Sequence, residues 1–176
     1  MRRAKAWFSL TGLLTVLGMV ASLGVAASPA SAYSPNPTAV TATRDTDLCP
    51  CVIKDTADGT VFKYDAGGQA VKVSLFHNGS MVGKVEFHPY GEYLWIYDTK
   101  ADGDAIYVTL TAEYSVIGLP DTRFPSSGAY KSPPAGDDYG YRVENLSIQE
   151  GIPVTIRVYD GSGPSDHIVT VGGGVA

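Results

Sequence analysis

Three aspartates share one short polar segment of the sequence. Asp98, Asp102 and Asp104 lie in residues 98–104, which also contain Gly103. Carboxylate oxygens in a flexible loop are ligands that calcium prefers, and the ion takes about six to eight oxygens. The spacing is not that of the EF-hand loop, and aspartate is also common in turns because its side chain bonds to nearby backbone. The sequence therefore leaves open a calcium site and a purely structural turn, and it predicts no other cofactor.

Hydrolytic chemistry has weaker support in the sequence. A serine nucleophile needs a base and an orienting acid held around it, and the consecutive residues Ser165, Asp166 and His167 cannot aim their side chains at one another in that geometry. No Gly-x-Ser-x-Gly turn is present. A glycosidase would instead use two carboxylates from distant strands. Their spacing singles out no two of the available glutamates, which are Glu86, Glu92, Glu113, Glu144 and Glu150. No catalytic residue is predicted.

The two cysteines, Cys49 and Cys51, are separated by a single proline. In an oxidising compartment such a pair is expected to form a disulfide. Free thiols, a covalent link to another chain and a soft-metal site are the alternatives. We predict an oxidised pair of modest structural consequence.

A run of alternating residues predicts a β-hairpin around the acidic turn. If residues 92–117 form two strands, Ile96 lies opposite Ile106 and Leu94 opposite Val108, which makes one face aliphatic. Every second residue of a strand points to the same side. The other face therefore collects four aromatic side chains, those of Tyr93, Trp95, Tyr97 and Tyr107.

This aromatic face is the sharpest functional feature of the sequence. A flat group of rings could stack against sugars or against the apolar surface of another protein. Alternatively, the proline-containing segment 118–140 covers the rings and makes them part of the core. Long connections of this kind are often functional loops. The leading hypothesis is a non-catalytic module that binds glycan or a protein surface. The alternative is a small hydrolase or hydrolase inhibitor that works through segment 118–140.

The elements that position these residues are short strands. Apolar residues recur with a period of two between clusters of Gly, Asp, Asn and Pro, and no segment has a convincing helical period. The prediction is an all-β protein, an antiparallel β-sandwich of the Ig-like or Greek-key type with about seven or eight strands. The cysteine and tryptophan spacing of antibody domains is absent, so the prediction covers architecture alone.

A first hairpin is expected over residues 71–87, around Asn78 and Gly79. A two-residue loop would place Val73 opposite a lysine and so mix apolar and charged residues on one face. We therefore predict a three-residue loop, 77–79, which places Leu75 opposite Met81 and Val71 opposite Val85.

The first 32 residues have the layout of an export signal. Arg2, Arg3 and Lys5 precede an apolar stretch, which ends in small residues at Ala30 and Ala32. The predicted organisation is a signal peptide over 1–32, a flexible lead-in over 33–51 and one domain over 52–176. Tyr33 would be the first residue of the mature, secreted protein, and an uncleaved membrane anchor is the alternative.

Removing the signal makes the protein more acidic. The charge changes from −5 to −8, because ten basic residues then face eighteen acidic ones. Nucleic acids and anionic membranes attract proteins with a positive surface. We therefore expect an extracellular glycan or protein as the partner, and neither nucleic acid nor membrane after cleavage.

Overall fold

The computed structural model describes residues 33–114, 122–125, 128–135, 140–161 and 166–176. The predicted export signal and much of segment 118–140 lie outside these residues. The described chain forms β-strands and one short 3-10 helix, η1. Their bounds are β1 Thr38–Asp45, η1 Thr46–Leu48, β2 Cys51–Ile53, β3 Thr60–Phe62, β4 Gln69–His77, β5 Ser80–His88, β6 Tyr93–Asp98, β7 Tyr107–Tyr114, β8 Thr122–Pro125, β9 Tyr130–Lys131, β10 Gly140–Asn145, β11 Pro153–Tyr159 and β12 His167–Val175.

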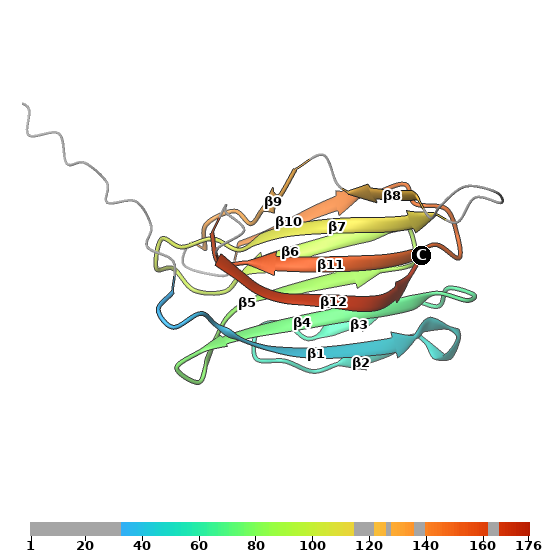
Figure 1. Ribbon diagram of the computed structural model, residues 1–176. Helices are drawn as coiled ribbons and strands as arrows, with labels where there is room; N and C mark the ends of the chain where they lie inside the picture. Colours follow the sequence, from blue (N-terminus) through green and yellow to red (C-terminus); the bar gives the residue numbers. More distant parts are fainter. Residues whose placement is uncertain (1–32, 115–121, 126–127, 136–139, 162–165) are drawn as a thin grey trace, which may run out of the picture.

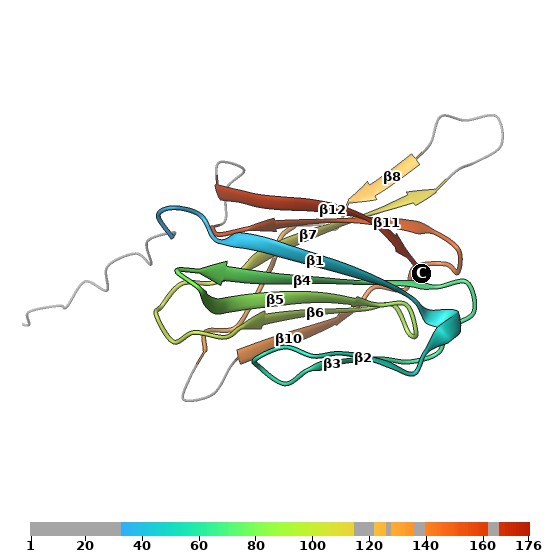
Figure 2. The same ribbon diagram turned by 90° about the horizontal axis from the view of Figure 1, so that it is seen from below.

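Ten of these strands form one antiparallel sheet that folds onto itself in two layers (Figures 1 and 2). The first layer contains β10, β6, β5, β4 and β1 in that order. The second contains β12, β11 and β7, with β8 and β9 both paired to β7. A single residue pair, Val175 with Gln69, joins the layers between β12 and β4. The predicted antiparallel β-sandwich is confirmed.

The hydrophobic core lies between the two layers. Alternate residues of each long strand point inward and exclude water almost completely, as the sequence pattern predicts. Each buried aliphatic side chain stabilises the fold by roughly 1.5–3 kcal/mol. The inward residues include Val71, Val73 and Leu75 of β4, Val85 and Phe87 of β5, Leu94 and Ile96 of β6, Val108 and Leu110 of β7, and Val154, Ile156 and Val158 of β11.

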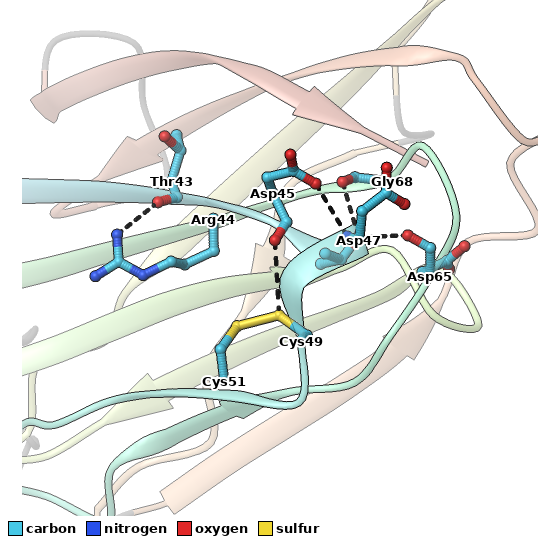
Figure 3. The surroundings of a disulfide bond; sticks show 9 residues. Thr43, Arg44, Asp45, Asp47, Cys49, Cys51, Asp65 and Gly68 are labelled. Carbon is cyan, nitrogen blue, oxygen red and sulfur yellow. Dashed lines mark hydrogen bonds between the residues drawn. A yellow bond between two sulfur atoms is a disulfide. The ribbon is translucent and has the colours of Figure 1, made fainter.

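A third, smaller layer covers the outside of the first one. Strands β2 and β3 pair only with each other and lie below β4, β5 and β6 in Figure 2. Phe62 of β3 packs there with Cys49 and Ala70, next to Cys51 and Ile53. A disulfide joins the two cysteines where the chain leaves η1, and Cys49 Sγ lies 3.8 Å from the carbonyl oxygen of Asp45 (Figure 3).

The predicted flexible lead-in over 33–51 is wrong, because it contains β1. This strand pairs along its whole length with β4, from Thr38 opposite Phe76 to Asp45 opposite Gln69. Most of its side chains are exposed. An apolar period is therefore missing from its sequence, and the strand is held by its backbone hydrogen bonds.

The predicted register of the first hairpin is also wrong. The loop has two residues, Asn78 and Gly79, with φ angles of 49° and 77°, as a tight hairpin turn requires. A bulge at Val82 then shifts the pairing by one residue. Val73 consequently lies opposite Val85, so the bulge achieves the match of apolar faces that we had assigned to a longer loop.

The second predicted hairpin does not form. Strand β6 pairs with β5 and β10, whereas β7 pairs with β11 in the other layer. The acidic segment 98–104 therefore connects two layers rather than two neighbouring strands. Leu94 and Val108 both face the core, but from opposite sides. Within the described ranges, no helix is long and apolar enough to cross a membrane.

Candidate functional site

The outer face of β6 carries three of the four predicted aromatic residues. Leu94 and Ile96 point into the core, so Tyr93, Trp95 and Tyr97 point outward. Strand β10 adds Tyr141 opposite Tyr97 and Val143 opposite Trp95 on the same face. Tyr107 does not join them. It lies on β7 in the other layer, where the Lys131 ammonium is 5.5 Å from its ring centre.

The rings on this face lie close together and nearly parallel. The Trp95 centroid is 5.6 Å from that of Tyr141, with an angle of 17° between the planes, and 6.1 Å from that of Tyr97, with an angle of 16°. Tyr97 is only 4 % exposed, whereas Tyr141 is 53 % exposed and Tyr93 36 %. The rings thus extend from a buried base at Tyr97 to solvent.

Exposed apolar groups surround these rings and form what we call the aromatic patch. It consists of Tyr90, Tyr93, Trp95, Tyr141 and Val143, of which all but the half-buried Trp95 are exposed. Contiguous exposed apolar surface of this kind marks interaction sites in soluble proteins. The alternative that segment 118–140 seals the whole face is not supported, since Tyr93 and Tyr141 remain exposed to solvent among the described residues.

A recess of about 170 Å³ lies beside the aromatic patch, between β3 and β6. It is smaller than the cavities of roughly 300–1,000 Å³ that enclose a small-molecule ligand. The recess therefore suits a shallow contact with part of a larger ligand. Its lining combines rings with two basic side chains, and consists of Val61, Lys63, His88, Tyr90, Tyr93 and Trp95.

A cluster of buried charges joins the loop between β2 and β3 to the outer face of β4 and β5. The Lys84 ammonium is 3.1 Å from a carboxylate oxygen of Asp55 and 2.8 Å from one of Glu86, and it also pairs with Asp58. The Lys72 ammonium lies 2.5 Å from Asp55. We call these five residues the buried charge cluster. The side chains of both lysines, Asp55 and Glu86 are at most 3 % exposed.

The charges in this cluster compensate one another. Burial alone would raise the pKa of Asp55, but hydrogen bonds from Lys72 and Lys84 hold it well below its usual range. Burial would likewise raise the pKa of Glu86, and hydrogen bonds from His88 and Lys84 lower it instead. Both carboxyl groups are therefore ionised at neutral pH. Burial would lower the pKa of Lys84, yet its acidic partners raise it.

The buried charge cluster also supports the aromatic patch. The Lys84 ammonium lies 4.3 Å from the centre of the Tyr97 ring, within the range of a cation–π contact. Glu86 holds the His88 ring through a 3.0 Å contact, and that ring lies 5.7 Å from Trp95. The cluster thus positions the rings from below.

The three carboxylates of this cluster have cationic partners within the protein. Oxygens of Asp55, Asp58 and Glu86 lie within 4.8 Å of one another, the one such group of metal-ligating atoms among the described residues. The Lys84 ammonium already contacts all three carboxylates, and the Lys72 ammonium contacts Asp55. Cationic charge is therefore supplied by the protein itself.

The three aspartates of the predicted calcium site do not converge on one point. Asp98 is 3 % exposed, and its two oxygens accept hydrogen bonds from the backbone N–H groups of Lys100 and Ala135. Asp102 accepts from the backbone of Asp104 and from the phenol of Tyr33. These contacts are those of a structural turn, and the calcium site stays a prediction from the sequence.

Hydrolysis gains no support from the described residues. Of the converging carboxylates, Asp55 and Glu86 have lowered pKa values, so neither is a candidate general acid. His167 contacts the hydroxyl of Thr170 at 2.9 Å. Ser165 lies outside the described residues.

Sequence reasoning missed Tyr90, Tyr141, His88 and the whole buried charge cluster. Lys72, Lys84 and Glu86 alternate with apolar residues, a pattern typical of a solvent-facing strand surface. A sequence pattern shows which side a residue takes and not what covers that side. Comparisons with protein-family models, with curated proteins and with solved structures find no match to this chain.

Proposed function

We propose that this protein is a secreted, non-catalytic binding module whose aromatic patch binds an extracellular carbohydrate. The observation that carries the proposal is the set of rings at Tyr93, Trp95 and Tyr141, presented on a rigid sheet with the two tyrosines exposed and Trp95 half-buried between them. The predicted export signal over residues 1–32 supports the assignment to the secreted proteins.

Carbohydrate fits the chemistry of the patch. The faces of aromatic rings carry partial negative charge, which attracts the C–H groups of a sugar ring, while phenol groups offer hydrogen bonds to sugar hydroxyls. Lys63 and His88 add further polar groups at the rim of the recess. The small volume of that recess suits one or two residues of a polymer better than an enclosed metabolite.

A rigid base favours binding without rearrangement. Trp95 and Tyr97 lie on a central strand, paired on both sides, and Lys84 and Glu86 hold the rings from below. Side chains that are ordered before binding lose less entropy when the ligand arrives. The patch is therefore suited to bind a carbohydrate surface without rearranging its own side chains.

The test is a glycan array, followed by sedimentation with insoluble polysaccharides, using the secreted protein. We expect Tyr141→Ala and Trp95→Ala each to weaken carbohydrate binding about tenfold, which corresponds to roughly 1.4 kcal/mol. Tyr107→Ala is the matched control, because this tyrosine lies on the opposite layer. It should leave binding unchanged.

Thermal unfolding of each variant separates binding from folding. Tyr141 is exposed, so its removal should leave stability nearly unchanged. Equal carbohydrate binding by Tyr141→Ala, Trp95→Ala and the parent protein would refute the proposal. Binding of a protein partner through the same residues, with no glycan bound, would support the patch as a binding surface and refute carbohydrate as its ligand.

A further inference from the structure

Tyr33, the first described residue, is anchored to the domain at three points. Its backbone nitrogen donates to a carboxylate oxygen of Asp160 at 2.5 Å. Its phenol donates to Asp102, and its ring lies 4.7 Å from the ring of His77. The chain is therefore fixed to the fold from this residue onward.

Asp160 is an unusual acceptor for a backbone amide. Its side chain belongs to a fully buried residue, 0 % exposed, and among the described residues its other oxygen, Oδ1, has no hydrogen-bond partner. The charged side chains that act on it most strongly are Asp104, Asp166 and Asp102, all acidic. A buried carboxylate normally has a cation beside it, and the described residues provide none here.

The electrostatics of Asp160 reflect this missing charge. Burial, and then the negative charge of Asp104, raise the pKa of Asp160 to about 7, and the single N–H of Tyr33 lowers it only in part. An amide N–H carries no net charge and offers one hydrogen, so it cannot satisfy both carboxylate oxygens.

The sequence places the cut of the export signal at this same residue. Ala30 and Ala32 fit the cleavage pocket of a signal peptidase, so Tyr33 becomes the new N-terminus. Water then adds across the Ala32–Tyr33 peptide bond. Ala32 keeps the carboxylate, and the nitrogen of Tyr33 leaves as an amine that takes up a proton.

We propose that cleavage after Ala32 converts the Tyr33 nitrogen into an α-ammonium that forms a buried ion pair with Asp160, so that removal of the signal completes the fold. The ammonium supplies the missing positive charge and three hydrogens in place of one. A second hydrogen is then available for the unpartnered Oδ1. The inference is independent of what the aromatic patch binds.

The test starts from the full precursor, expressed in a bacterial host that exports and processes it. Intact mass and N-terminal sequencing of the secreted product should show Tyr33 as its first residue. The comparison protein carries Gly-Ser inserted between Ala32 and Tyr33. Cleavage then leaves the ammonium two residues away, about 7 Å along an extended chain, and restores an amide at Tyr33.

We expect the insertion to lower the melting temperature by roughly 5–10 °C, because a buried charge loses its partner. Asp160→Asn should lower the melting temperature of the parent protein by a similar amount. In the inserted protein the same substitution should cause no loss. A secreted product that begins elsewhere, an insertion without effect, or an equal effect of Asp160→Asn in both proteins would overturn the proposal.

A second readout does not depend on how well the Asp160 variant folds. The α-amine of the parent protein should react with an acylating reagent at neutral pH at least ten times more slowly than the α-amine of the inserted protein. Mass spectrometry of the N-terminal peptide gives both rates. Equal rates would show that the Tyr33 amine is free in solution, which contradicts the proposal.

Discussion

Two groups of buried carboxylates in this protein have opposite properties. One group contains Asp55 in the loop between β2 and β3 and Glu86 on β5, and the pKa values of both are lowered. Asp160 belongs to the other group, together with Asp102 and Asp104, and its pKa is raised to about 7. Since burial acts in the same direction on all of them, the difference comes from the partner. Lysines accompany the first group, whereas acidic neighbours surround the second.

The pKa of a buried carboxyl group in this protein therefore depends on whether a cation lies beside it. In the buried charge cluster, that cation is part of the strand sequence and is present as soon as β4 and β5 pair. Near Asp160, by our proposal, it arises only after proteolysis. The first site is thus complete in the precursor, and the second becomes complete in the mature protein.

The largest expected effect comes from removing the central cation of the buried charge cluster. Lys84→Met leaves Asp55 with the Lys72 ammonium and Glu86 with His88, and it should lower the free energy of unfolding by about 3–5 kcal/mol. Urea denaturation at pH 7 measures the loss. Glu86→Gln added to this variant should recover part of the loss, because the unpaired charge is removed.

The matched control for this prediction is Lys100→Met. The Lys100 ammonium lies 3.9 Å from Asp102, and its side chain is 46 % exposed. Exposed pairs stabilise proteins by at most about 1 kcal/mol. Equal losses for the two lysine variants would show that burial does not strengthen the cluster.

The next effect is the pH dependence of stability, which has opposite signs for the two groups of carboxylates. In the protein with Gly-Ser inserted before Tyr33, the folded pKa of Asp160 stays above its unfolded value of about 3.9. A raised carboxyl pKa means that the folded state binds the proton more tightly. Its contribution to stability is therefore largest at low pH and is lost as pH rises through about 7.

The measurement is the melting temperature of the inserted protein between pH 5.5 and about pH 8. It should fall by several degrees over this range, and Asp160→Asn should flatten the curve. Asp55 and Glu86 have the opposite sign. Their lowered pKa values stabilise the fold above about pH 4, and this contribution is lost as pH falls further. A curve for the inserted protein that rises from pH 5.5 to 8 would contradict the assignment.

The sequence was sufficient to predict the two-layer β architecture, because alternation at Leu94 and Ile96 or at Val154 and Ile156 follows directly from a strand with one buried face. It also located the outward aromatic residues of β6. Pairing between strands was harder. Residues 98–104 have the composition of a hairpin turn, but the chain crosses between layers there, and local composition does not encode that distinction.

The missed features share a physical cause. The exposed strand β1 is stabilised by backbone hydrogen bonds, to which its side chains contribute little pattern. Lys72 and Lys84 lie on the outer face of β4 and β5, as their alternation with apolar residues indicates, but the loop between β2 and β3 covers them. Tyr141 joins the aromatic patch through the pairing of β10 with β6, a contact between segments more than forty residues apart. Such long-range contacts depend on the assembled fold.

The smallest expected effect is that of removing the disulfide, which tests what holds the hairpin of β2 and β3 against the sheet. Cys49 and Cys51 close a loop of three residues, and chain entropy for such a short loop predicts a stabilisation of roughly 1–2 kcal/mol. If buried charges hold β2 and β3 against the sheet, Cys49→Ser with Cys51→Ser should lower stability less than Lys84→Met does. Urea denaturation of the two proteins side by side decides this. A larger loss for the serine variant would assign the anchoring of the hairpin, and with it the support of Tyr97 and His88, to the cysteines rather than to the charges.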